Sequence, residues 1–208
     1  MRGLVTFAAA LFGALLLVQL AAACGAWWLH SQARVDDEIA WLEGLEPVLV
    51  WDVGLESRIG GLYRQRIQGE LSQGRLDRAA HALRLARARA KSLGNPRDDA
   101  LMALGIETFT RAADRLEGHG QLSLAADWDD SLFVLAVRAP EPRHRYAALA
   151  AFIEGLDLRT RDGKPCAALS RVEWAKRGLG GQVPGLQANV EEDLRLQCNL
   201  SRRTGREP

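Results

Sequence analysis

The sequence predicts an all-α protein, in which an N-terminal transmembrane helix precedes a helical domain. An uncharged run extends from Leu4 to Cys24, and turn-forming residues recur at short intervals after it. The segments between these turns are rich in Ala, Leu and Arg, which are good helix formers. Two short apolar runs, at 48–51 and 132–135, are the nearest approach to a strand pattern. Each is too short to distinguish a strand from one turn of a buried helix.

The first run is long enough to cross a bilayer. Its 21 residues include one strongly polar side chain, Gln19, and a helix of that length spans roughly 30 Å, the thickness of the hydrocarbon core. Arg2 precedes the run, whereas Trp27-Trp28 and the acidic residues 36–38 follow it. Tryptophan suits the headgroup region, and this charge asymmetry directs the N-terminus inward. We therefore expect a bacterial inner-membrane protein with one span and its C-terminal domain in the periplasm.

Two alternatives to an uncleaved anchor remain for this segment. A secretory peptide could be cleaved after the small residues 21–23. Leu20 to Cys24 also resembles a loose lipobox, with Ala21 where leucine is usual, so that Cys24 would be lipidated. All three interpretations export the rest of the chain.

The other two cysteines, Cys166 and Cys198, are expected to pair. Cys166 begins one helical stretch (166–177) and Cys198 ends the next (186–198), so an antiparallel hairpin brings them together, as a disulfide requires. Closing a loop of about 33 residues contributes roughly 3–4 kcal/mol in the chain-entropy model. The alternative is a pair of reduced, buried thiols. Their spacing matches neither a metal knuckle nor a redox Cys-x-x-Cys motif.

The segment 76–93 shows the helical pattern best. Its apolar residues fall within one arc of roughly 160° at 100° per residue, and its cations occupy the complementary arc. Further along, Asp98-Asp99 form an acidic first turn after a proline, and Pro142 and Pro165 are placed at helix starts. About seven or eight helices are expected beyond the anchor.

A weak internal repeat is present. Gly74, Gly120 and Gly163 are each followed four or five residues later by paired alanines. A glycine permits a tight turn between two helices, and alanines allow the helices to approach closely, as in stacked αα-hairpins.

On these residues the chain resembles the tetratricopeptide (TPR) family over about 55–177. Residues 73–79 look like the turn into that repeat's second helix, with Leu83 and Ala86 at packing positions. Phe152 with Gly163, Ala168 and Ala175 gives a second partial match, although the spacing exceeds the usual 34 residues. The resemblance implies a TPR-like domain that binds other proteins in a concave groove. A generic helical bundle is the alternative.

The expected organisation has four parts. Residues 1–29 form the signal-anchor, 30–53 a membrane-proximal connector helix, 54–200 the TPR-like helical domain and 201–208 a disordered tail.

The sequence contains no motif that indicates catalysis, a cofactor or a metal. Phosphate-loop, His-Glu-x-x-His and Gly-x-Ser-x-Gly patterns are absent. The glycine-rich stretch 178–185 is interpreted as a hairpin loop. Residues 127–130, which include three carboxylates, are interpreted as a solvated or partner-facing patch. The histidines are interpreted as surface or turn residues: His30, His81, His119 and His144.

The remaining candidates are interaction surfaces. A net charge of +1 argues against nucleic-acid binding. One candidate is the basic face formed by Arg75, Arg78, Arg84, Arg87 and Lys91, which suits an acidic protein surface or anionic lipid. Trp41 and Trp51 are candidates for a membrane-proximal contact. We expect a non-enzymatic scaffold or adaptor that binds other envelope proteins. The alternatives are a lipoprotein with the same domain, or a helical bundle that binds a small molecule.

Overall fold

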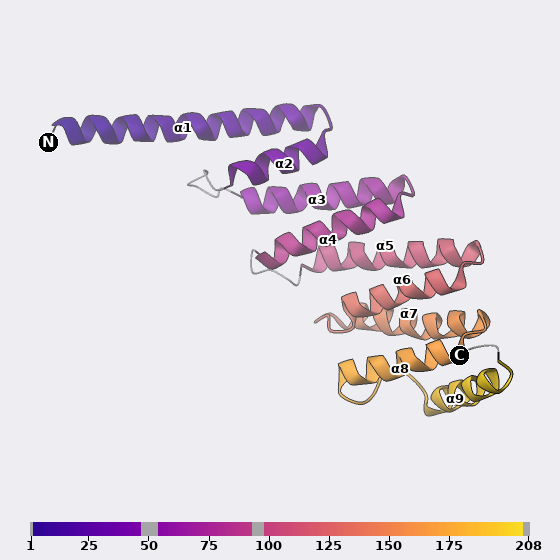
Figure 1. Cartoon of the computed structure of the whole chain (residues 1–208). Helices are drawn as coiled ribbons and strands as arrows, with labels where there is room; N and C mark the ends of the chain where they lie inside the picture. Colours follow the sequence, from indigo (N-terminus) through magenta and orange to yellow (C-terminus); the bar gives the residue numbers. More distant parts are fainter. Residues whose placement is uncertain (1, 47–53, 93–97, 206–208) are drawn as a thin grey trace. The chain divides into compact units, whose positions relative to one another are not determined.

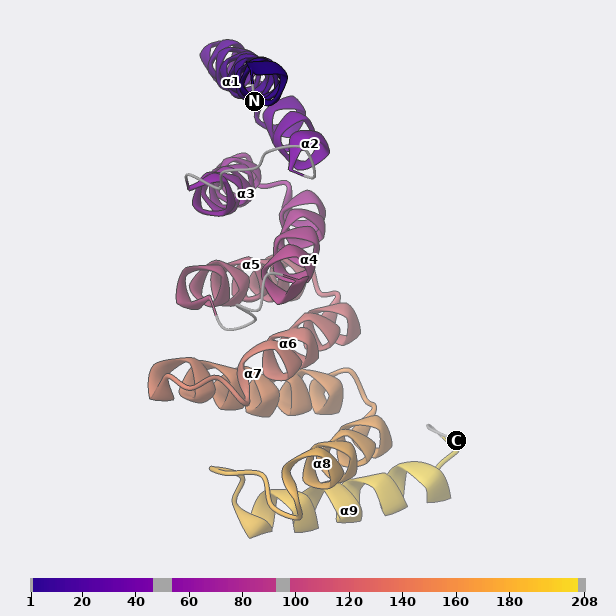
Figure 2. The ribbon, with the colours of Figure 1, turned by 90° about the vertical axis from the view of Figure 1, so that its left-hand side faces the viewer.

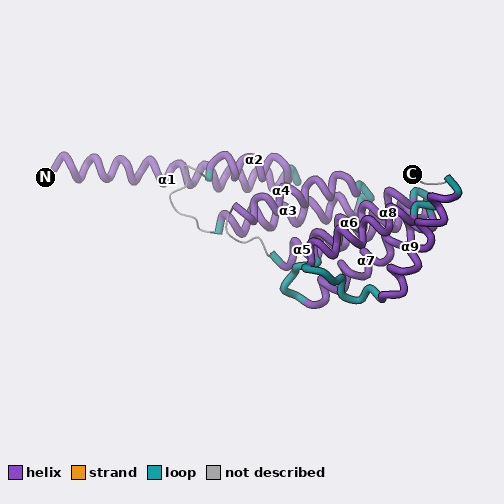
Figure 3. Tube along the Cα trace, turned by 60° about the horizontal axis from the view of Figure 1, so that its bottom comes forward, coloured by secondary structure: helices purple, strands orange, loops and turns teal. Residues whose placement is uncertain are grey.

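The computed structural model describes residues 2–46, 54–92 and 98–205, with side chains from residue 10 onward. All regular structure in these ranges is helical, as the sequence predicts (Figures 1 and 3). The chain divides into two compact units, Met1–Pro96 and Arg97–Pro208.

The first unit contains four helices within the described ranges: α1 (Arg2–Ser31), α2 (Val35–Leu45), α3 (Leu55–Ser72) and α4 (Leu76–Ser92). Each helix packs against the next along the chain. In α3 buried residues recur at intervals of one helical turn, at Ile59, at the adjacent pair Leu62 and Tyr63, at Ile67 and at Leu71, so they form one stripe along the helix.

Helix α4 confirms the amphipathic pattern predicted for 76–93. Its buried residues are Ala79, Ala80, Ala82, Leu83 and Ala86, all within the predicted apolar arc. Four of these five are alanine, so this face carries little side-chain bulk and allows the neighbouring helix to approach closely.

The second unit contains five helices within the described ranges: α5 (Asp99–Gly118), α6 (Leu122–Ala136), α7 (Pro142–Arg161), α8 (Pro165–Leu179) and α9 (Ala188–Arg203). Sequential helices pack together, and α5 also packs against α7. Figure 2 shows α5 and α7 on one side of the unit and α6 and α8 on the other. Phe133, Phe152 and Trp174 meet in its core, with ring centroids 4.5 and 5.8 Å from Phe133.

Three hairpin turns share one geometry. Gly74, Gly120 and Gly163 join α3 to α4, α5 to α6 and α7 to α8, with φ of 68°, 74° and 76°. After each glycine the next backbone N–H donates to the carbonyl five residues earlier, at 2.8–2.9 Å, which satisfies a carbonyl at the helix end. The predicted turn glycines are thus confirmed. Ala33, between α1 and α2, adopts the same left-handed conformation with φ of 53°.

Helix ends also follow the predicted signals. Asp98 caps α5 by accepting a hydrogen bond from the Leu101 N–H at 3.0 Å, and Pro142 and Pro165 open α7 and α8. Helix α9 continues through Arg203, into the stretch expected to be disordered.

Candidate functional site

The basic face of α4 is only partly available. Arg78, Arg84, Arg87 and Lys91 are exposed, whereas Arg75 forms an ion pair with Glu70 at the end of α3. The surface that remains open to a partner therefore consists of the four exposed cations.

Trp41 packs against α1. Its ring leaves no space for a side chain at Gly25, where an added Cβ would lie 2.8 Å from ring atoms, and its Nε1–H donates to the Ala22 carbonyl at 3.3 Å. The residue remains 42% exposed. Trp51, the other candidate of this pair, lies outside the described residues.

The α1–α2 contact extends to both sides of Cys24. Ala22, Ala26 and Leu29 are buried, at 5%, 0% and 8% exposure, while Cys24 itself is a free, exposed thiol. Residues Ala10–Ser31 form a helix long and apolar enough to cross a membrane, or to act as a signal sequence. The last two turns of this helix are thus part of the folded first unit.

A buried carboxylate connects α1, α2 and α3. Glu38 is fully buried. Its Oε1 accepts two hydrogen bonds from Arg58, at 2.7 and 3.1 Å, and its Oε2 lies 3.1 Å from Nδ1 of His30. Sequence reasoning missed this cluster, although Glu38 is one helical turn from Leu42 and so lies on the buried face of α2.

The acidic run 127–130, predicted to be a solvated or partner-facing patch, is not solvated as a whole. Asp129 and Asp130 are only 3% and 4% exposed. Position 129 lies four residues after Ala125 and four before Phe133, both buried, so the core-facing stripe of α6 passes through it. Only Asp127 of the three carboxylates is exposed.

Two arginines compensate part of this buried charge. Arg159, on α7, is 6% exposed and donates to Asp127 at 2.8 Å and to Asp130 at 2.7 Å. Arg171, on α8, also pairs with Asp130 at 2.7 Å. These contacts connect α6, α7 and α8. Sequence reasoning did not identify either arginine as a partner.

Asp129 lacks such compensation. Burial, first, and the nearby charges of Glu154, Asp130 and Asp114 together raise the pKa of Asp129 to about 7, and Arg159 opposes the shift. Burial also raises the pKa of Asp130, against the opposing effect of its arginine partners. Asp129 is therefore a buried carboxyl whose proton is gained or lost near neutral pH.

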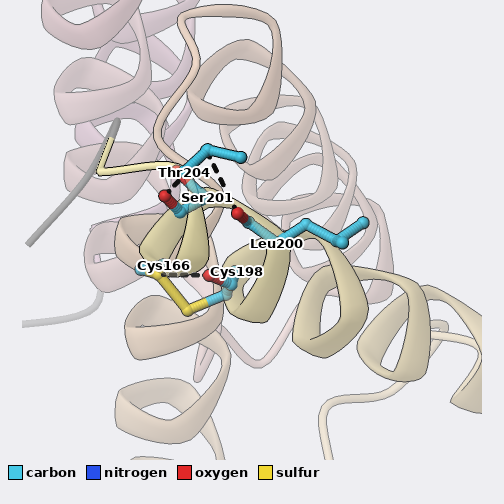
Figure 4. The surroundings of a disulfide bond; sticks show 5 residues. All are labelled: Cys166, Cys198, Leu200, Ser201 and Thr204. Atoms are coloured by element: carbon cyan, nitrogen blue, oxygen red, sulfur yellow. Dashed lines mark hydrogen bonds between the residues drawn. A yellow bond between two sulfur atoms is a disulfide. The ribbon is translucent and has the colours of Figure 1, made fainter.

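The predicted disulfide is present. Cys166, at the start of α8, is joined to Cys198 on α9, with Cα atoms 4.6 Å apart (Figure 4). Six residues later, Thr204 Oγ1 donates to the carbonyls of Leu200 and Ser201 at 3.1 and 3.0 Å. The bridge therefore fastens the last helix to α8 close to a hydrogen-bonded helix end.

The four histidines lie in different surroundings. His81 and His119 are exposed, as predicted. His144 is 5% exposed, and its Nδ1 lies 3.3 Å from Asp99; the surface interpretation is wrong there because the start of α7 packs near the start of α5. His30 is exposed but belongs to the Glu38 cluster. Among the described residues, no group of three or more His, Cys, Asp or Glu side chains is arranged to hold a metal ion.

The glycine-rich stretch 178–185 leads from α8 toward α9. It contains three left-handed glycines and one buried anchor, Val183, as a tight connection between two helices requires. Beside it, Phe133, Val134 and Trp174 line a shallow recess of about 200 Å³ between α6 and α8. That volume is below the range of roughly 300–1,000 Å³ that is typical of small-molecule sites.

Comparisons with known proteins found no relative of this chain: no family model, curated protein or solved structure matches it.

Proposed function

We propose that this chain is a single-span bacterial inner-membrane protein whose TPR-like helical hairpins, in the periplasm, bind protein partners as a scaffold or adaptor in a cell-envelope assembly. The observation that carries the proposal is the shared hairpin turn at Gly74, Gly120 and Gly163, with small residues buried in each following helix. Arrays of similar helical hairpins present extended surfaces and act by binding other proteins.

The α1–α2 contact favours an uncleaved anchor. Cleavage before Cys24 would remove Ala22, whose carbonyl accepts the Trp41 N–H, and would leave Ala26 and Leu29 on the short remainder of α1 that begins at Cys24. Mass spectrometry of the protein purified from membranes tests this: the full α1 sequence is expected. A mature chain that starts at a lipidated Cys24 would establish the lipoprotein alternative instead.

The disulfide supports export. Such bonds persist in oxidising compartments, including the periplasm, and are rare in the cytosol. Alkaline phosphatase fused after residue 205 is therefore expected to be active, and green fluorescent protein at the same position to be dark. The reverse pattern would refute the proposed orientation.

The exposed cations of α4 are the proposed partner surface, because they suit an acidic protein face. A photo-crosslinking amino acid at His81, within this exposed face, is expected to give an adduct of defined mass in intact cells. Charge reversal by Arg84→Glu with Lys91→Glu should abolish the adduct. Anionic lipid is the alternative ligand, and sedimentation with phosphatidylglycerol vesicles separates the two.

A crosslinker at Asn189, exposed on α9, serves as the control for these experiments. Equal adducts from both positions, insensitive to the charge reversal, would contradict a specific surface on α4. No adduct from any exposed position of α3 to α8 would contradict the scaffold function.

A further inference from the structure

Helix α9 has a buried face and an opposite, exposed face. The buried residues Leu194 and Cys198 mark the side that packs against α8, and the disulfide lies on that side. At 100° per residue, Leu196 and Leu200 lie on the opposite side, one helical turn apart. They are 58% and 60% exposed, and the Leu200 side chain points away from the disulfide (Figure 4). Helix α9 therefore exposes two large apolar side chains next to each other.

Charged residues of opposite sign flank this leucine pair. Glu192 and Asp193 lie about one turn before the pair and Arg203 about one turn after it, so these three residues share its face. Each of them is exposed. We call the five residues together the outer face of α9: Glu192, Asp193, Leu196, Leu200 and Arg203.

The charges of the outer face are not used inside the chain. Within the described ranges, the ion pairs of α9 are those of Glu191 with Lys176 and Arg195, and Glu191 is not on the outer face. Asp193 accepts a hydrogen bond from the neutral Gln197 amide at 2.7 Å, which leaves its charge uncompensated. The outer face is therefore acidic before the leucines and basic after them, with both charges available to another molecule.

This pattern is complementary to itself when two copies of α9 lie antiparallel. Each leucine is covered by a leucine of the other copy only in the register that places Leu196 opposite Leu200. The same register places Asp193 opposite Arg203 at both ends of the contact, although the charges played no part in choosing it. The overlap covers residues 193–203, about 15 Å at 1.5 Å per residue, and leaves Asn189 outside.

A parallel arrangement would not have this complementarity. It would place Asp193 beside Asp193 and Arg203 beside Arg203, and like charges at these distances repel. The helix dipoles would also point the same way, whereas in an antiparallel pair the positive end of each helix lies beside the negative end of the other. The charges of the outer face therefore select the antiparallel pair.

We propose that the outer face of α9 is a self-association surface, on which a second copy of this chain packs its own α9 antiparallel. The contact is isologous, with the same patch used by both copies. Removal of the leucines from water drives it, and the two Asp193–Arg203 pairs fix its register. A helix pair this short buries less than the roughly 1,200 Å² of a stable interface. Pairing therefore depends on confinement of both copies to one membrane, which raises their effective concentration, and this part of the inference rests on the proposed single span.

The experiment uses the full chain in liposomes of phosphatidylethanolamine and phosphatidylglycerol. A donor dye is attached after residue 205 in one preparation and an acceptor dye at the same position in another, and the two are mixed. Energy transfer at increasing protein-to-lipid ratio gives the density of half-maximal pairing. We expect transfer that an excess of unlabelled chain removes. Transfer no greater than that of randomly distributed dyes would overturn the proposal.

Charge reversal tests the register. Asp193→Lys or Arg203→Glu alone should raise the density of half-maximal pairing roughly tenfold, because in the symmetric contact each variant replaces two attractive pairs by two repulsive ones. Asp193→Lys combined with Arg203→Glu should return this density to within about twofold of the native value, because opposite charges again face each other. A purely structural role of either residue would not give this rescue. A double variant as weak as the single variants would overturn the antiparallel register.

An apolar substitution tests the leucine contact. Leu196→Ser should raise the density of half-maximal pairing about fivefold or more, since the symmetric contact loses this leucine twice. The matched control is Leu124→Ser, the same change at a leucine of α6 that is 53% exposed, and it should leave pairing unchanged. Circular dichroism verifies that both variants are folded. Equal losses in the two variants would overturn the assignment to α9.

Crosslinking in cells separates a second copy from other occupants. A photo-crosslinking amino acid at Leu200 is expected to give an adduct with the mass of two chains. An adduct with a different protein, and none with the mass of two chains, would assign the outer face to that protein and overturn self-association. If energy transfer is absent while the His81 adduct persists, the α9 surface is refuted and the scaffold function stands. Transfer without a His81 adduct would support the α9 surface and count against the α4 surface.

Discussion

Removing the Asp129 charge is expected to stabilise the protein at neutral pH and to flatten its pH dependence. The folded-state pKa of about 7 lies above the ordinary value for aspartate, about 3.9. Between these values the folded protein holds a proton that the unfolded chain has lost, so stability falls as pH rises from about 4 to about 7 and then levels. A carboxyl whose pKa is raised in the folded state therefore lowers the unfolding free energy, and this loss reaches its full size at pH values above the folded-state pKa.

The magnitude follows from the same two values. At about 1.36 kcal/mol per pKa unit, the contribution amounts to roughly 1.5 kcal/mol at pH 5 and roughly 4 kcal/mol at pH 8. The stability difference between Asp129→Asn and the native chain should therefore grow by about 2–3 kcal/mol across this interval. Any pH-independent cost of fitting the asparagine cancels, because the prediction concerns the change with pH.

Chemical denaturation of the full chain in detergent, followed by tryptophan fluorescence, measures this difference. Trp128 is on the same helix as Asp129 and contacts Phe109, with ring centroids 5.5 Å apart, so its emission reports on this part of the second unit. Asp193→Asn, at an exposed position of α9, is the control. Its difference in unfolding free energy from the native chain should not increase between pH 5 and pH 8. A parallel pH dependence in Asp129→Asn and the native chain would refute the argument.

Three other predictions concern stability. Ala33→Gly should raise the unfolding free energy by up to about 1 kcal/mol, because a non-glycine residue is strained at φ of 53°; a lower melting temperature would contradict this. Arg159→Ala should cost roughly 3 kcal/mol, since it removes one of the cations paired with buried Asp130, and an unchanged denaturation midpoint would refute it. Replacing both Cys166 and Cys198 by serine should cost about 2–4 kcal/mol, and adding reductant should then have no further effect on the variant.

Local features of this fold were accessible from the sequence. The length and polarity of the first helix, the apolar arc of α4 and the helix starts at Asp98, Pro142 and Pro165 each depend on residues within a few positions of one another. The turn glycines are equally local, because a left-handed residue is needed wherever a helix reverses tightly. Predicting the disulfide required only one further assumption, namely that two consecutive helices are antiparallel.

The charge clusters could not be derived in this way. Arg58 reaches Glu38 across 20 residues, and Arg159 reaches Asp130 across 29. The sequence pattern of a single helix predicts which of its faces is apolar. It does not predict which distant helix packs on that face, or which cationic side chain of that helix pairs with the buried carboxylate. From the sequence alone, the acidic run at 127–130 is therefore interpreted as a solvated or partner-facing patch. In the fold, two of its three carboxylates, Asp129 and Asp130, are buried. Their burial, and the raised pKa of Asp129 that follows, were decided by the packing of α6 against α5 and α7, because that packing removes water from the carboxylates.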